Sequence, residues 1–187
     1  MSPPNLPGWD NIPIVQMLED KYSLPAFLQN DANACALVEW KMGAARGSQD
    51  MVFLTMGTGM GAGIILNNRL VVGQDNMAGE VGHLRLAQDG PVGFGKAGSF
   101  EGFTSGGGIH QQAVSLTRRL VKEGRPPAWI VDGYQEEQLD AKVMAEYAKR
   151  GDKDAFFLYD QVGTMLGRGL ALIVDALNPQ CIVIATT

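Results

Sequence analysis

Residues 50–73 read DMVFLTMGTGMGAGIILNNRLVVG and alternate apolar runs with turn residues. Within this stretch, three apolar runs are separated by glycines and by an Asn-Asn pair: 50–56, 64–66 and 69–73. Apolar runs that follow each other closely, with turn residues between them, are typical of antiparallel strands joined by hairpins. The sequence therefore predicts an antiparallel meander at this point of the chain.

The segment between the first two of these strands, residues 57–63 (GTGMGAG), admits two interpretations. Its backbone N–H groups can converge on an anion such as a phosphate, with the Thr58 hydroxyl as a further donor. Alternatively, it is a hairpin turn whose glycines adopt positive φ angles, and the stretch alone favours this second interpretation. It is not a Walker loop, because no Gly-Lys-Ser/Thr follows and because it joins strand to strand.

The rest of the chain predicts helices and two further strands. A helix begins near Asn11, which can cap it, with Pro13 in its first turn, and a short strand follows at 24–28. Helices and then a final buried strand are expected at 32–45, 107–122, 140–150, 154–177 and 181–185. The last of these helices contains three glycines that would allow close packing: Gly163, Gly167 and Gly169. A meander, then helices, then a returning strand is half of a two-domain plan rather than a whole one.

Composition excludes several classes of protein. The 187-residue chain is 45% hydrophobic, which supports a buried core, and its net charge of −5 offers no basic surface for nucleic acid. No apolar run approaches the roughly 18 residues of a membrane helix, and the N-terminus has no secretory signal. Cys35 and Cys181 lie in apolar contexts without partner cysteines, which predicts buried, reduced thiols. We therefore expect a cytoplasmic protein that binds neither membrane nor nucleic acid.

The pair Asn30-Asp31 lies between the predicted strand at 24–28 and the helix that follows it. A carboxylate at this position could accept the proton of a substrate hydroxyl as the hydroxyl oxygen attacks phosphorus. Asp and Asn are also preferred helix N-caps, and the local sequence by itself favours that structural role. A catalytic base at Asp31 is thus one of two open interpretations.

Three polar residues are embedded in the glycine-rich segment 73–108: Glu80, His83 and Glu101. Side chains of this kind can hydrogen-bond the hydroxyls of a sugar, although each taken singly is better explained as a surface residue. His83 alone is a weak metal candidate, because no second His or Cys stands at ligand spacing.

Together these segments resemble a known family. In chain order they read PNLPGWDN, LPAFLQNDANACALVEW, MGTGMGAGIILNNRLVVG, AGEVGH, GSFEGFTSG and ALNPQCIVIA. The combination resembles the ROK family (repressor, open reading frame, kinase) of bacterial sugar kinases and sugar-responsive regulators. The resemblance implies an incomplete actin-like ATPase (ribonuclease H-like) fold of class α/β. Residues 1–30 would be the end of the first domain and the hinge. Residues 31–187 would be a truncated second domain, with an antiparallel-plus-parallel sheet flanked by helices.

The resemblance also implies roles for the candidate residues. Asp31 would be the catalytic base and Asn30 a sugar ligand, because they match the family's Asn-Asp-x-Asn segment. Further sugar ligands would be Glu80, His83 and Glu101. A phosphate loop would be formed by Gly57, Thr58, Gly59 and Gly61. The implied activity is phosphorylation of a hexose or N-acetylhexosamine by ATP with Mg, in a homo-oligomer such as a dimer. The alternative is the non-catalytic, sugar-binding portion of a ROK transcriptional regulator.

The chain also departs from the family pattern. Many members carry Cys-x-Cys-Gly-x-x-Gly-Cys and bind zinc with these cysteines and the preceding histidine, whereas residues 92–99 read VGFGKAGS. We therefore expect no zinc, and a loop held instead by packing of Val92 and Phe94. The family's Asp-x-Gly-Gly-Thr loop and its adenosine-binding glycine pair are absent, so we expect the isolated chain to transfer phosphate poorly or not at all. An apolar face left uncovered would favour self-association, which makes a dimerisation fragment a third possibility.

Overall fold

The computed structural model describes residues 8–186, and the chain divides into two compact units, residues 1–31 and 32–187. The first four residues of the PNLPGWDN segment, 4–7, lie outside the described residues. Among the residues that are described, no helix combines the length and the apolar character needed to cross a membrane.

The first unit contains helix α1 (Ile14–Tyr22), as predicted. The helix begins later than a cap at Asn11 requires: its N-cap is Pro13, without a side-chain hydrogen bond, so the predicted capping is wrong. It ends at Tyr22, and its C-cap Ser23 adopts the left-handed conformation and donates its N–H to the carbonyl of Glu19.

The strand predicted at 24–28 is wrong. This segment has no regular secondary structure, because no strand in the described part of the chain pairs with it. The Ala26 N–H instead donates to the carboxylate of Glu19 at 3.1 Å, and the Phe27 side chain is 93% exposed.

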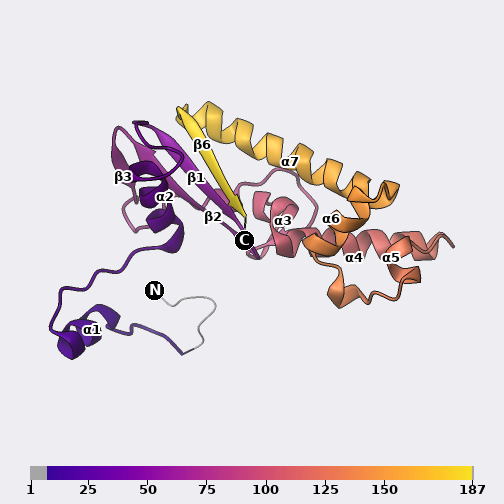
Figure 1. Ribbon diagram of the computed structural model, residues 1–187, viewed down its shortest axis with the longest axis horizontal. Helices are drawn as coiled ribbons and strands as arrows, with labels where there is room; N and C mark the ends of the chain where they lie inside the picture. The colour runs from indigo at the N-terminus through magenta and orange to yellow at the C-terminus, as the bar shows by residue number, and fades with distance from the viewer. Residues whose placement is uncertain (1–7, 187) are drawn as a thin grey trace. The chain divides into compact units, whose positions relative to one another are not determined.

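The second unit is built on a four-stranded sheet with the strand order β3-β2-β1-β6. β1 (Met51–Met56), β2 (Met60–Leu66) and β3 (Arg69–Val71) form the predicted antiparallel meander. β6 (Cys181–Thr186) returns to pair in parallel with β1. The mixed sheet with helices on its faces confirms the predicted α/β class (Figure 1).

Two glycines of the glycine-rich segment are strand residues. β2 begins at Met60, four residues earlier than predicted, and therefore includes Gly61 and Gly63. A Cβ at Gly63 would lie only 2.4 Å from the Cβ of Ala36, which belongs to the helix packed on this face. These glycines serve close packing between helix and sheet, and no glycine of the segment 57–63 has the predicted positive φ.

Three helices flank the sheet: α2 (Asp31–Lys41), α3 (Phe100–Thr104) and α7 (Lys153–Leu177). Successive residues of β1 point to opposite faces, as the two-residue period of a strand requires. Met51 and Phe53 are buried on the face covered by α2. Val52 and Leu54 are buried on the other face, in a cluster that contains Phe100 of α3 and side chains of α7. Figure 1 shows α7 leading into β6 at the edge of the sheet.

The long helix α7 approaches α3 closely at one of its glycines. A Cβ at Gly169 would lie 2.3 Å from the ring of Phe100, so the prediction of close packing is confirmed there. A Cβ at Gly163 or Gly167 would meet nothing within 4 Å in the described residues, and the prediction is wrong for these two.

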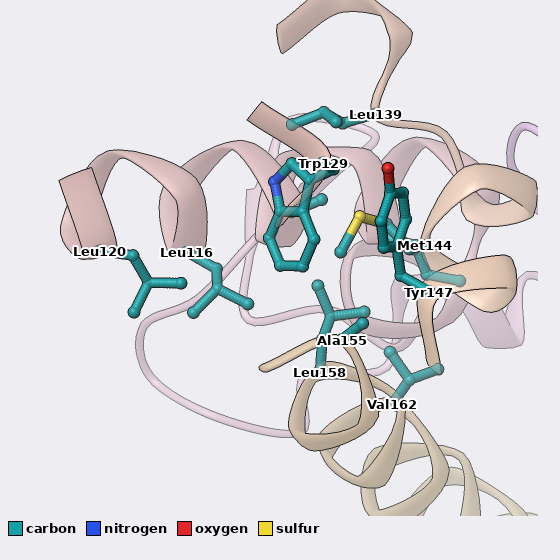
Figure 2. Close-up of a cluster of buried hydrophobic side chains, with 11 residues drawn as sticks. Leu116, Leu120, Trp129, Leu139, Met144, Tyr147, Ala155, Leu158 and Val162 are labelled. Atoms are coloured by element: carbon teal, nitrogen blue, oxygen red, sulfur yellow. The ribbon is translucent and has the colours of Figure 1, made fainter. Parts of the chain in front are cut away.

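A second hydrophobic core lies among four helices, of which α5 was not predicted: α4 (Gly106–Lys122), α5 (Ala128–Val131), α6 (Ala141–Lys149) and the first half of α7. Figure 2 shows Trp129 between Leu116 and Tyr147 in this core. The indole Nε1 of Trp129 donates to Thr117 Oγ1 at 2.8 Å, which satisfies the polar end of the buried ring. A short 3₁₀ helix, η2 (Glu136–Gln138), precedes α6.

The two cysteines are less buried than predicted. Cys35 is exposed on α2, and Cys181, the first residue of β6, is only partly buried. Cys35 stands three residues after Ala32 and one before Ala36, the residues that face the sheet, so its own side chain lies outside that contact.

Candidate functional site

The candidate residues fall in both units. Asn30 and Asp31 end the first unit, and both are exposed. Asp31 is the first residue of α2, where the partial positive charge of a helix N-terminus stabilises a carboxylate. The other candidates belong to the second unit: Gly57, Thr58, Gly59, Gly61, Glu80, His83 and Glu101. The position of Asn30 and Asp31 relative to them stays a prediction.

The glycine-rich loop proper is a three-residue connection, 57–59, between β1 and β2. All three of its carbonyl oxygens accept hydrogen bonds inside the second unit: Gly57 O from Gly106 N at 2.8 Å, Thr58 O from Gly107 N at 3.1 Å, and Gly59 O from Gly57 N at 3.0 Å. Gly106 and Gly107 are the first residues of α4, whose terminal N–H groups have no partner within their own helix. The loop is therefore fastened to the N-terminus of α4 through its carbonyl groups.

The amide side of the same loop is accessible. Within the part of the chain that the structure describes, no hydrogen bond engages the N–H groups of Thr58 and Gly59, and both residues are exposed. Because the carbonyl oxygens are already bonded, the groups left to meet a ligand are N–H donors and the Thr58 hydroxyl, a combination that suits an anion. The loop is a hairpin connection, although its glycines lack the predicted positive φ, and phosphate binding by its N–H groups stays a prediction.

Glu101 lies directly beside this loop. Its Oε2 accepts the N–H of Met60, the residue that follows the loop, at 2.8 Å, and a Cβ at Gly59 would lie 3.0 Å from the same oxygen. Glu101 is held on α3, whose N-cap Ser99 is buried and accepts the Gly102 N–H through its Oγ at 3.1 Å. The structure thus brings Glu101 and the glycine loop together, which the sequence separation of about 40 residues did not reveal.

Glu80 and His83 are joined by the short 3₁₀ helix η1 (Val81–His83). Glu80 Oε2 lies 3.7 Å from His83 Nε2, and the two side chains are 44% and 27% exposed. Gly82 lies between them in the chain, and a Cβ there would be 3.2 Å from the Cβ of Glu101. The three candidate sugar ligands Glu80, His83 and Glu101 therefore come from neighbouring segments.

The segment 92–99 forms a small hairpin of β4 (Val92–Gly93) and β5 (Lys96–Ala97). Val92 and Phe94 are 45% and 68% exposed, so the prediction that their packing holds the loop is wrong, apart from one contact of the Phe94 ring with His83. Hydrogen bonds hold it instead. Gln111 on α4 bonds both the N–H and the carbonyl of Val92, at 2.9 and 2.8 Å. Lys96 Nζ donates to the carbonyl of His83 at 2.9 Å, and the ring of Phe94 stacks on the His83 imidazole.

The hairpin does not offer the ligands of a zinc site. The positions that carry cysteines in the family pattern are Val92 and Phe94, which have no donor atom, and Ser99, whose hydroxyl is buried and caps α3. A single imidazole cannot complete a tetrahedral zinc site. Among the described residues no three His, Cys, Asp or Glu side chains gather as a metal group would require.

Sequence reasoning missed three contributors to the site: Lys96, Gln111 and the backbone N–H of Met60. Lys96 and Gln111 act through hydrogen bonds to backbone carbonyls, and such bonds leave no pattern in a sequence. Phe94 was assigned to packing, although the Phe94-Gly95 pair between two short β-type segments was a signal of a tight turn rather than of a core position.

Comparison with known proteins places the chain in a family context. The model of the ROK family matches residues 1–187. A glucokinase of Halalkalibacterium halodurans is 35% identical over 179 residues, which cover 95% of this chain and 53% of the glucokinase. A xylose repressor of Caldicellulosiruptor bescii is 33% identical over 182 residues, which cover 97% of this chain and 44% of the repressor.

Solved structures give the same result for the fold. The crystal structure of a ROK family glucokinase from Streptomyces griseus in complex with glucose and AMPPNP matches with a TM-score of 0.78 and 30% sequence identity. The match covers 96% of this chain and 57% of the glucokinase. It confirms the predicted actin-like ATPase fold, and the chain spans about half the length of the glucokinases that it matches.

Proposed function

The chain belongs to the ROK family, and on this premise we propose that it is the sugar-recognising portion of an ATP-dependent sugar kinase. The substrate class that we propose is a hexose or an N-acetylhexosamine. Glucose and an ATP analogue bound to the Streptomyces griseus relative support both halves of this proposal.

One observation carries the proposal: Glu101 bonds the residue that follows the glycine loop, at 2.8 Å. A side chain suited to sugar hydroxyls thereby stands beside backbone groups suited to phosphate. A phosphoryl transfer requires these two functions side by side, because catalysis of this reaction depends on positioning and on neutralising charge.

The roles that we propose are those that the resemblance implies, and the chemistry of the groups is compatible with them. Glu101, Glu80 and His83 would hold sugar hydroxyls by hydrogen bonds, with Asn30 as a further ligand, and such bonds reject analogues that lack the hydroxyl. Asp31 would accept the proton of the attacking hydroxyl. This base is the first residue of α2, and the next residue of the helix, Ala32, packs against β2 at Gly61.

ATP with Mg would supply the phosphoryl group. This chain has groups suited to one part of ATP, the phosphates. The N–H groups of Thr58 and Gly59 and the Thr58 hydroxyl are the donors that would hold phosphate oxygens. Since the chain spans about half of each matched glucokinase, we propose that the isolated polypeptide does not turn over ATP.

A second candidate function is the sugar-sensing part of a ROK regulator. The 33% identity to the Caldicellulosiruptor bescii xylose repressor favours it. The residues Glu80, His83 and Glu101 would bind a sugar in either case, so the two functions differ in phosphoryl transfer and not in recognition.

Grafting separates the two functions. The segment of the Halalkalibacterium halodurans glucokinase that aligns with this chain is replaced by the chain itself, and sugar-dependent ADP release is measured with a panel of hexoses and N-acetylhexosamines. The kinase proposal predicts ADP release that is lost in Asp31→Asn and kept in Asp160→Asn, which removes an exposed carboxylate on α7. A folded graft that binds sugar and releases no ADP would identify a binding module instead.

We also propose that the protein is a homodimer. Leu172 and Val174 on α7 are each 45% exposed, and uncovered apolar side chains of this size favour association. Light scattering of the purified chain tests this, since a mass of one chain at micromolar concentration contradicts it.

A further inference from the structure

The tip of the β4–β5 hairpin has an unusual residue for its backbone conformation. Gly93 pairs with Lys96, so the turn contains two residues, Phe94 and Gly95, and both have positive φ angles, 46° and 73°. Two-residue turns with this conformation are dominated by Asn, Asp and Gly, because other side chains collide with their own backbone at positive φ. A bulky phenylalanine at the first position is therefore disfavoured by local sterics.

Burial does not compensate for this strain. The Phe94 side chain is 68% exposed and takes no part in any of the hydrophobic clusters. Its one ring contact among the described residues is with His83: the two ring centroids are 4.7 Å apart and the planes are inclined by 16°. Strained residues that a fold retains are typical of functional sites. At Phe94, the contact that accompanies the strain is the stacking of its ring on His83.

His83 is restrained from three directions. The Phe94 ring covers a face of the imidazole, Glu80 Oε2 lies 3.7 Å from its Nε2, and Lys96 Nζ bonds its carbonyl at 2.9 Å. Without the ring of Phe94, the imidazole could rotate about its Cβ–Cγ bond, because aromatic χ2 angles have broad minima.

We propose that Phe94 is a positioning residue that holds the imidazole of His83 in a fixed orientation by aromatic stacking. Phe94 lies on a hairpin whose side chains cannot bind zinc. In this proposal the ring of Phe94, and not a metal ion, orients the imidazole of His83. The consequence for sugar affinity rests on the proposed function, in which His83 contacts a sugar hydroxyl, whereas the orientation of the ring does not depend on it.

Proton resonances of the two histidines test the stack directly in the full chain. His83 and His110 are the only histidines of the sequence, and a ring stacked on the imidazole is expected to shift the Hε1 signal of His83 upfield. Phe94→Asn is expected to abolish this shift and to leave the signal of His110 unchanged. Asn suits a positive φ, so the variant keeps its fold and its melting temperature, which separates loss of the ring from unfolding. Phe94→Tyr restores the shift, and Phe156→Gln, which removes an exposed phenylalanine from α7, leaves it unaltered.

Sugar binding tests the consequence. Phe94→Asn is expected to weaken the affinity for a hexose by about two- to tenfold, the range that an aromatic pair contributes, and Phe94→Tyr to restore it. An unchanged His83 resonance in Phe94→Asn overturns the stack, and a lost shift with unchanged sugar affinity overturns the positioning role. If the wild-type chain binds no sugar, the proposed function fails, while the resonance of His83 still decides whether Phe94 orients it.

Discussion

The carboxylate of Glu101 accepts a 2.8 Å hydrogen bond from the backbone N–H of Met60, 41 residues earlier in the chain. The bond joins α3, which carries a candidate sugar ligand, to the strand that begins directly after the glycine loop. Any movement of the loop is thereby coupled to the position of the Glu101 side chain.

Substitution of Glu101 is expected to separate its structural role from its charge. Glu101→Ala leaves the N–H of Met60, a buried residue, without its acceptor and should lower the free energy of unfolding by about 1–3 kcal/mol. Glu101→Gln keeps an acceptor oxygen and should cost less than half as much. Urea denaturation measures both values, and equal losses in the two variants would show that the hydrogen bond does not hold the loop.

Gly163 and Gly169 lie on the same helix, α7, and form a matched pair of substitution sites. Gly169→Ala places a Cβ 2.3 Å from the Phe100 ring, so overpacking should lower the free energy of unfolding by about 1–3 kcal/mol. Gly163→Ala meets no described residue within 4 Å and should raise the free energy of unfolding by up to about 1 kcal/mol, because alanine favours helix more than glycine does. The same denaturation experiment compares them, and a loss of equal size in both would contradict the close approach of α7 to α3.

Stability at high pH should depend on Tyr147. Burial, together with the hydrogen bond that its hydroxyl donates to Asp132, raises the pKa of Tyr147 from about 10 to about 12. A raised folded-state pKa means that the folded chain holds the phenolic proton more tightly, so this contribution to stability is complete below pH 10 and is lost as the pH rises towards 12.

The variant Tyr147→Phe removes the titrating group and should show a shallower decline in the free energy of unfolding over that interval. Some decline remains, because burial also raises the pKa of Tyr159. Wild-type and variant curves that run parallel from pH 10 to pH 12 would contradict the assignment.

Chelation of metal should leave the fold unchanged. Val92, Phe94 and Ser99 offer no zinc ligand beside His83. The hairpin is held by two hydrogen bonds between Val92 and Gln111 and by the bond that Lys96 donates to the His83 carbonyl. We expect the same melting temperature with and without a strong chelator, measured by circular dichroism. A purified chain that contains one equivalent of zinc, and that melts lower once the zinc is removed, would show that other residues bind it.

Much of the fold could be predicted because its signals are local. Asn67 and Asn68, both with positive φ, mark the turn between β2 and β3, and the apolar runs on either side have the length of strands. The strand expected at 24–28 failed because its composition says nothing about whether a neighbouring strand is there to pair with it. The helix α5 was missed because its four residues are too few for a helical period to be recognised.

The site was harder to predict from the sequence, because the roles of its residues depend on contacts with residues distant in the chain. Gly63 was assigned to a turn, although it is a strand residue that makes room for Ala36 on α2. Phe94 was assigned to packing because it is hydrophobic, and only the structure places its ring against His83. The sequence left the role of Asp31 open between a catalytic base and a helix cap, and the role of Asn30 came from the resemblance; both roles remain predictions.

The proposed function requires that this chain binds a hexose or N-acetylhexosamine through Glu80, His83 and Glu101. Calorimetric titration of the purified chain with a panel of these sugars measures this binding. We expect saturable binding of at least one sugar, weakened roughly tenfold in Glu101→Gln because a charged hydrogen-bond acceptor becomes a neutral one. A folded chain that binds none of the sugars, or that binds one equally well in the wild type and in Glu101→Gln, would contradict it.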